Sequence, residues 1–164
     1  MSKIAGIYWD DTAAAPGISL SVYFSGCHFH CPGCHNPEAQ DFNYGRDYDT
    51  DIRQEKMEKI KKNGVMRTLC ILGGEPLCNE NLAAVIALIG WCKQDYPDLK
   101  IYVWTGYTIE ELEARDDADV MAVLRNITCL IEGRYIQELR DTTLPLRGSS
   151  NQRIIMMEDY FNGK

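Results

Sequence analysis

Short apolar segments alternate with helical segments along most of this chain, and this alternation restricts its fold more than any other feature. The segments expected to be strands are residues 18–24, 68–72, 101–104, 128–131 and 153–156. The segments expected to be helices are residues 50–63, 79–92 and 117–125, and a helix that starts at Thr108. Alternating strands and helices are typical of an α/β protein with a parallel sheet and outer helices. The chain has 164 residues and a closed eight-fold barrel needs roughly 200 or more, so we expect a partial, open β/α barrel.

Polar residues and glycine mark the ends of these helices. Asn79 is a candidate N-cap for the most apolar helix. Thr108 and Glu111 have the spacing of a capping box, in which each residue satisfies a backbone amide of the other. Gly64 follows the polar helix at a position typical of a C-terminal glycine.

Composition and charge narrow the class of protein. Hydrophobic residues make up 45% of the chain and charged residues 25%, which predicts one globular domain over residues 1–164. The net charge of −7 argues against a nucleic-acid partner. The sequence lacks a run of about 18 apolar residues and a signal peptide, so we expect no membrane segment and a cytoplasmic location.

The chain carries seven cysteines, and three of them lie within eight residues. An odd number of cysteines in a reducing compartment argues against a disulfide framework. Cys27, Cys31 and Cys34 have C-x3-C-x2-C spacing. Three thiolates at this spacing can bind one face of a cubane iron–sulfur cluster and leave one iron open to a substrate.

Two other readings of this loop stay open from the residues alone. Three cysteines with His28, His30 or His35 as a fourth ligand would form a structural zinc site. Two of the three cysteines could instead form a redox disulfide. We interpret the remaining cysteines as small apolar core residues, and these are Cys70, Cys78, Cys92 and Cys129.

Unusual residues follow three of the expected strands. The cysteine loop follows the first, Gly73-Gly74-Glu75-Pro76 follows the second, and Thr105-Gly106-Tyr107 follows the third. Because the carboxyl ends of parallel strands meet at one edge of the sheet, we expect these loops to form one shared site.

Four sequence blocks give the chain a resemblance to a known family. They are Cys-Pro-Gly-Cys-His-Asn (31–36), Gly-Gly-Glu-Pro-Leu (73–77), Thr-Gly-Tyr-Thr-Ile-Glu-Glu-Leu (105–112) and Leu-Arg-Gly-Ser-Ser-Asn-Gln-Arg (146–153). The cysteine spacing with Gly-Gly-Glu-Pro resembles the radical S-adenosylmethionine (SAM) superfamily. The four blocks together resemble the activating enzymes of anaerobic (class III) ribonucleotide reductases.

The resemblance implies a cofactor set and the residues that bind it. Cys27, Cys31 and Cys34 would bind a [4Fe-4S] cluster whose open iron binds SAM. Gly73, Gly74 and Glu75 would receive the methionine amino group. Thr105, Gly33, Cys34 and His35 would border SAM, and so would Arg153 in the last block. No catalytic residue beyond the cluster and SAM is implied.

Three positions differ from what the resemblance leads us to expect. Gly33 departs from the broad radical SAM pattern, in which many proteins have an aromatic residue there, but it agrees with the Cys-Pro-Gly-Cys form of the activases. His35 stands where the activases more often have Tyr, and Glu132 stands where Asp is expected.

The resemblance also implies two partners. They are the large glycyl-radical subunit of an anaerobic ribonucleotide reductase and a flavodoxin- or ferredoxin-like electron donor. The alternatives are an activase of another glycyl-radical enzyme, such as a formate lyase, and a non-catalytic iron–sulfur or zinc-binding module.

Overall fold

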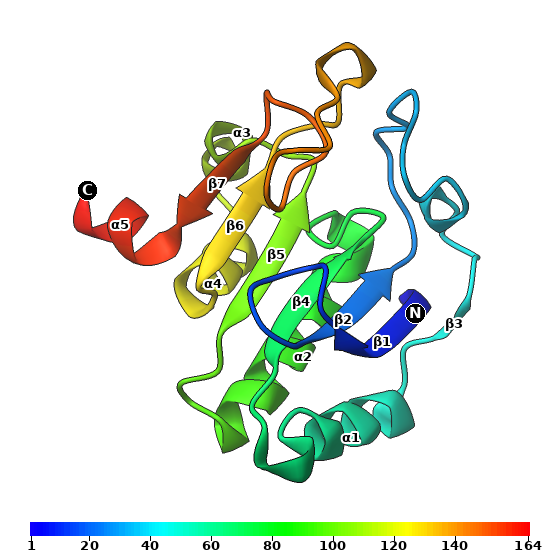
Figure 1. Cartoon of the computed structure of the whole chain (residues 1–164), viewed down its shortest axis with the longest axis vertical. Helices are drawn as coiled ribbons and strands as arrows, with labels where there is room; N and C mark the ends of the chain where they lie inside the picture. Colours follow the sequence, from blue (N-terminus) through cyan, green and yellow to red (C-terminus); the bar gives the residue numbers. More distant parts are fainter.

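The computed structural model describes the backbone of residues 1–164 and all side chains except those of Thr50, Ile52, Arg53, Lys56 and Met57. Its centre is a seven-stranded mixed sheet with the strand order β3-β1-β2-β4-β5-β6-β7 (Figure 1). The strands are β1 (Lys3–Asp11), β2 (Ser19–Phe24), β3 (Arg46–Asp47), β4 (Thr68–Gly73), β5 (Ile101–Thr105), β6 (Cys129–Glu132) and β7 (Arg153–Met156). The helices are α1 (Thr50–Lys59), α2 (Asn79–Asp95), α3 (Ile109–Ala114), α4 (Ala118–Asn126) and α5 (Met157–Asn162).

The sheet is parallel only at its centre, so the prediction of a parallel sheet is wrong at both edges. Strands β2, β4, β5 and β6 run parallel, whereas β1, β3 and β7 pair antiparallel with their neighbours. Strand β7 follows β6 without an intervening α-helix, and an antiparallel pair needs no helical crossover. The prediction of an α/β protein with an open sheet is confirmed.

Strand β1 is absent from our sequence prediction, and its burial explains why. Only Ile4 is buried in this strand, and the remaining residues are half-buried or exposed. Gly6 and the pair Asp10-Asp11 also interrupt any apolar run. A strand near the edge of a sheet therefore carries a weak hydrophobic signal, although it completes the pairing of β2.

The helix ends partly match the prediction. The capping box of Thr108 and Glu111 is confirmed, because each side chain accepts a hydrogen bond from the backbone N–H of the other residue. The predicted cap at Asn79 is wrong: Cys78 is the N-cap residue of α2, and Asn79 is the first helical residue. Helix α1 ends at Lys59, and a separate 3-10 turn carries the chain through Gly64.

The two faces of the sheet differ in their covering. Helices α2, α3 and α4 lie behind the sheet in Figure 1, and the buried core of Leu, Val and Ile side chains fills the space between. Side chains that alternate with this core face the other way, such as Tyr23, Leu72 and Trp104, and are only half-buried. In Figure 1 the loop between β1 and β2 crosses in front of the sheet on this second face.

The fold positions the loops that carry the unusual residues. The arrows of β2, β4, β5 and β6 all point toward the top of Figure 1, and the loops that follow them gather there. Among the described residues, no helix is long and apolar enough to span a membrane.

Candidate active site

The loops at the carboxyl ends of the parallel strands enclose a cavity of about 170 Å³. Cys27, Cys31 and Cys34 line it from the loop after β2. Gly73, Gly74 and Glu75 line it from the end of β4, and Thr105 and Gly106 line it from the end of β5. The structure therefore brings residues from three distant parts of the sequence to one cavity.

The cysteine loop folds back on itself through its backbone. The N–H of Gly26 donates to the Ala39 carbonyl at 2.7 Å, and the N–H of Cys27 donates to the Gln40 carbonyl at 3.0 Å. The N–H of Cys34 closes a turn on the Cys31 carbonyl at 3.1 Å. Gly33 has a φ of 76°, a conformation that glycine adopts without a steric penalty.

All three thiols of this loop are free and half-buried. Burial raises the pKa of the Cys27 thiol, and the Glu75 carboxylate acts in the same direction, while the backbone of Phe29 and His30 stabilises the thiolate. A bound iron replaces the thiol proton and removes this penalty. Three thiols on one cavity wall fit the ligand set of an iron–sulfur cluster. Among the described side chains, no group of three His, Cys, Asp or Glu gathers closely enough for a single metal ion.

Glu75 is a fully buried carboxylate that ties β4 to β5. Its Oε1 accepts hydrogen bonds from the Leu77 N–H at 2.9 Å and the Thr105 hydroxyl at 2.7 Å. Its Oε2 accepts one from the Gly106 N–H at 2.7 Å. Burial raises the pKa of Glu75 to about 7, against the opposing effect of these three donors. A negative charge held at this depth favours a positively charged ligand group beside it.

The family is decided by comparison with known proteins. Residues 13–155 match a family model described as a 4Fe-4S single cluster domain. A protein of Vibrio cholerae serotype O1 is 36% identical over 145 residues, which cover 88% of this chain and 91% of that protein. A protein of Pasteurella multocida is 33% identical over 93% of this chain and 96% of its own length. One of Escherichia coli K12 is 32% identical over 87% and 90%. All three are named anaerobic ribonucleoside-triphosphate reductase-activating protein.

This chain belongs to that family. The resemblance inferred from the four sequence blocks is thereby confirmed. The family model also agrees with the [4Fe-4S] cluster that the cysteine spacing indicates.

Two residues beside the cysteines lie outside the small cavity of this activating-protein family member. His35 is exposed and packs edge-on against Tyr135, with ring centroids 5.0 Å apart. It lines a second, larger cavity of about 1010 Å³, which lies on the half-buried face of the sheet. Gly33 lies against Gln137, whose Oε1 would be 1.8 Å from an added Cβ. This close approach gives Gly33 a steric role where other family patterns have an aromatic ring.

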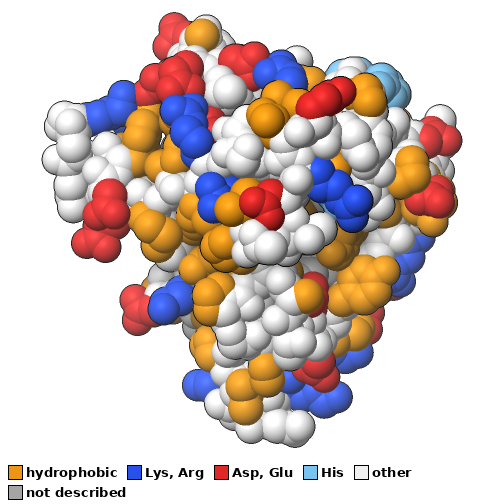
Figure 2. Space-filling model, turned by 45° about the horizontal axis from the view of Figure 1, so that its top comes forward, with side chains coloured by type: hydrophobic (Ala, Val, Ile, Leu, Met, Phe, Trp, Pro, Cys, Tyr) orange, Lys and Arg blue, Asp and Glu red, His pale blue; other side chains and the backbone are white. Residues whose placement is uncertain are grey.

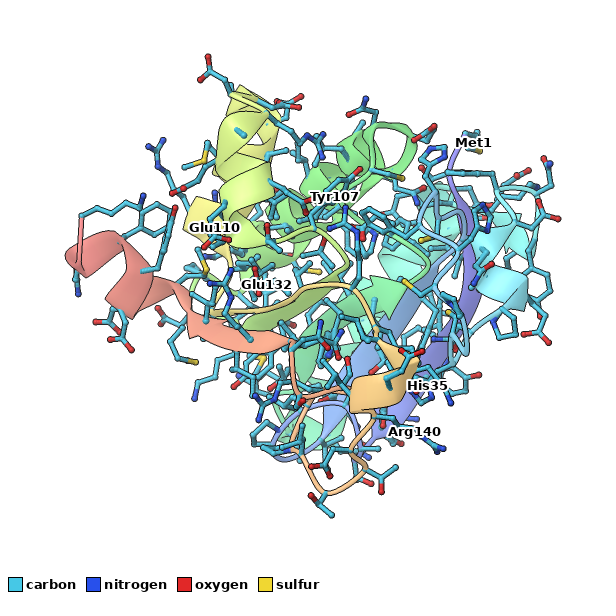
Figure 3. The ribbon with its side chains drawn as sticks, turned by 90° about the horizontal axis from the view of Figure 1, so that it is seen from above. Met1, His35, Tyr107, Glu110, Glu132 and Arg140 are labelled. Carbon is cyan, nitrogen blue, oxygen red and sulfur yellow. The ribbon has the colours of Figure 1, made fainter. Side chains whose placement is uncertain are left out.

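Arg153 also lies outside the small cavity. Its guanidinium donates to Glu132 at 2.8 Å and to Glu110, with Nη2 2.6 Å from the Glu110 carboxylate. Glu132 is buried and also accepts the N–H of Ile109 at 2.6 Å. Figure 3 shows Glu110 and Glu132 close together, with His35 and Arg140 on another side of the molecule. Arg153 thus joins β7 and β6 to α3, one residue away from Gln152, which does line the cavity.

Phe29 and Gln152 line the small cavity and are absent from the set of site residues predicted by sequence. Phe29 stands between two of the cysteines, which is a signal that the sequence offers. Its ring stacks under the guanidinium of Arg134 at 4.3 Å and meets the Tyr107 ring at 4.8 Å. Gln152 stands in the last of the four sequence blocks, but which polar residue of that block reaches the cavity depends on loops that the fold brings together.

The glycines of the β4 loop predict a specific cost of substitution. A Cβ on Gly74 would lie 2.6 Å from the carbonyl oxygens of both Ala39 and Gly26, so Gly74→Ala must displace backbone. We expect it to lower the free energy of unfolding by about 2–4 kcal/mol. Gly90→Ala is the matched control, because no atom of the described residues lies within 4 Å of that Cβ in α2, and it should stabilise by about 0.5–1 kcal/mol. Urea denaturation of both variants measures the difference, and equal stabilities would contradict the steric argument.

Glu75 predicts a pH dependence of stability. The pKa is 4.5 when unperturbed and about 7 in the folded chain, so the folded state binds the proton more tightly. The contribution of Glu75 is therefore fully present below pH 4.5 and is lost as the pH rises to about 7, by at most about 1.4 kcal/mol per pH unit. Glu75→Gln removes this titration. Urea denaturation at several pH values should show the stability of the native chain falling relative to Glu75→Gln between pH 5 and 7. A constant difference would refute the buried titration.

Proposed function

We propose that this chain is the radical-generating activase of an anaerobic ribonucleotide reductase and acts on the large glycyl-radical subunit of that enzyme. It reductively cleaves SAM at a [4Fe-4S] cluster, and a hydrogen atom then leaves a glycine Cα of the subunit for the 5′-deoxyadenosyl group. One observation carries the proposal: in a member of this family, three cysteines and the Gly73-Gly74-Glu75 loop converge on one cavity.

The thiolates of Cys27, Cys31 and Cys34 would hold the cluster, since no other cysteine among the described residues lines the cavity. Three ligands for four irons would leave one iron open to the amino and carboxylate groups of SAM. When bound and reduced, the cluster supplies the single electron that cleaves the sulfonium bond.

The protein contacts to SAM follow from the same cavity. Gly73 and Gly74 let the backbone approach the methionine end closely, and Glu75 supplies the negative charge for the amino group. Thr105 fixes the Glu75 carboxylate from β5. We assign His35 to the adenine side, with Gly33 shaping the loop beside it. For Arg153 we propose an indirect role, through Glu132 and the adjoining loop.

The proposal also includes the domain organisation, the electron donor and the cellular location of the protein. Residues 1–164 would form one radical SAM domain with a partial, open β/α barrel. A flavodoxin- or ferredoxin-like protein in the cytoplasm would supply the electron. The odd number of cysteines in the chain supports a reducing compartment.

The test uses anaerobically reconstituted protein, reduced with dithionite and mixed with SAM. We expect 5′-deoxyadenosine only in the reduced sample, and an unreduced sample is the control. Adding the large reductase subunit should then produce a glycyl radical detectable by electron paramagnetic resonance.

Two other outcomes separate the alternatives. Product formation without a radical on the reductase, but with a radical on a formate lyase, would assign the chain to another glycyl-radical enzyme. The absence of both 5′-deoxyadenosine and SAM binding would overturn the proposal in favour of a non-catalytic module.

A further inference from the structure

The small, cysteine-lined cavity adjoins the larger cavity of about 1010 Å³ on the half-buried face of the sheet. Among the residues whose side chains are described, four line both cavities, and these are Leu72, Trp104, Tyr135 and Gln152. They form the boundary between the two spaces, which we call the junction. In the proposed reaction, the hydrogen donor belongs to another protein, so the atoms that react must meet across a boundary of this kind.

Gln152 is the junction residue whose side chain binds the surrounding loops. Its Oε1 accepts hydrogen bonds from the N–H groups of Gly148 at 2.9 Å and Ser149 at 3.1 Å. Its Nε2 donates to the Gly133 carbonyl at 2.9 Å. This amide joins the chain after β6 to the chain before β7, and its donor and acceptor ends are both used.

The segment that Gln152 holds overhangs the larger cavity. We call residues 141–148 the overhang, and five of them line this cavity: Thr142, Leu144, Leu146, Arg147 and Gly148. The overhang closes on itself, because the N–H of Asp141 donates to the Gly148 carbonyl at 3.1 Å. Hydrogen bonds to Trp104 and Gln152 connect the overhang to the rest of the protein. The Trp104 indole N–H donates to the Leu146 carbonyl at 2.8 Å, and the Gly148 N–H donates to Gln152. Leu146 has a φ of 62°, a strained conformation for leucine that such ties must maintain.

The overhang has few other anchors in the part of the chain whose side chains are described. The Thr143 amide and hydroxyl donate only to Asp141, within the overhang. Arg147 donates to the carbonyls of Pro145 and Gln152. Figure 2 shows this upper side of the molecule, where exposed hydrophobic side chains lie between charged ones and do not form one continuous patch. The position of the overhang therefore depends strongly on Trp104 and Gln152.

We infer that Gln152 is a positioning residue for the proposed reaction. Its amide holds the overhang against the junction, so that the group cleaved from SAM on one side meets the donor glycine on the other. The chemical half of the inference, the alignment for radical transfer, rests on the proposed function. The structural half, the position of the overhang, rests on the hydrogen bonds alone. Loss of the amide should leave the cleaved group less well aligned with its target, so that it takes its hydrogen atom from another C–H donor in the protein or buffer, and 5′-deoxyadenosine forms without a glycyl radical.

The first readout is hydrogen exchange of the Gly148 and Ser149 amides in the full chain, measured by nuclear magnetic resonance. In Gln152→Met both amides lose their acceptor, and we expect their exchange to accelerate about tenfold. Gln152→Glu keeps the acceptor oxygen and loses the donor to Gly133, so exchange of these two amides should stay close to that of the native chain. Gln94→Met places the same substitution at an exposed position of α2 and should change neither amide.

The second readout is the ratio of glycyl radical to 5′-deoxyadenosine with the reductase present. We expect this ratio to fall about tenfold in Gln152→Met and to stay unchanged in Gln94→Met. Unchanged exchange in Gln152→Met would refute the positioning role. Faster exchange with an unchanged ratio would show that the overhang is held without any effect on transfer, and would overturn the chemical half. If the native chain does not cleave SAM, the proposed function fails, and the exchange data still decide the structural half.

Discussion

Cys31→Ala should eliminate assembly of the [4Fe-4S] cluster and, with it, all SAM cleavage. Cys31 is the middle ligand of a loop whose backbone already closes a turn from Cys31 to Cys34. Two thiols cannot occupy three corners of a cubane cluster, and the described part of the cavity wall offers no fourth cysteine in compensation. Iron and sulfide analysis after anaerobic reconstitution, with the visible absorption of the cluster, measures the loss.

The matched control for this substitution is Cys92→Ala. Cys92 is buried in α2 among core residues and lies away from the cysteine-lined cavity. Its substitution should cost about 1 kcal/mol in stability and retain four irons per chain. A full iron complement in Cys31→Ala would refute the assignment of that residue as a ligand, whereas iron loss in Cys92→Ala would point to a folding defect common to both.

Glu75→Ala should weaken SAM binding about 10- to 100-fold while the cluster is retained. The carboxylate is the only described acidic group that lines the small cavity, and it also fixes Thr105 and Gly106. Its removal therefore takes away the negative charge for the amino group and releases the β5 loop that shapes the cavity. None of the three cysteines depends on it for its backbone hydrogen bonds.

Equilibrium dialysis of reconstituted protein with SAM measures this affinity, and iron analysis verifies the cluster in the same sample. Glu158→Ala is the control, because Glu158 is exposed on α5 and does not line the cavity. An affinity equal to that of the native chain would remove Glu75 from the SAM site. A loss of iron along with affinity would instead assign to Glu75 a role in folding the cysteine loop.

The structure also explains which site residues could be predicted locally. The three cysteines and Gly73-Gly74-Glu75 carry their chemistry in short motifs, so the sequence alone indicates them. Arg153 illustrates the opposite case: a guanidinium in a polar block suits a ligand, yet here it binds Glu132 and Glu110. Two carboxylates 21 and 43 residues away in sequence satisfy its charge, and sequence spacing does not reveal such neighbours.

By itself, the sequence determined the local features of this protein. Short apolar runs specified the central strands β2, β4, β5 and β6, and helical spacing of apolar residues specified α2, because their buried residues leave a strong apolar signal. The cysteine spacing specified the cluster loop, because three ligands of one cluster must be close along the chain. The tertiary structure decided the antiparallel edges, the burial of Glu75 and the position of Gln152 at the junction. Each of these depends on contacts between segments distant in sequence, and such contacts form only when the sheet brings the strand ends together.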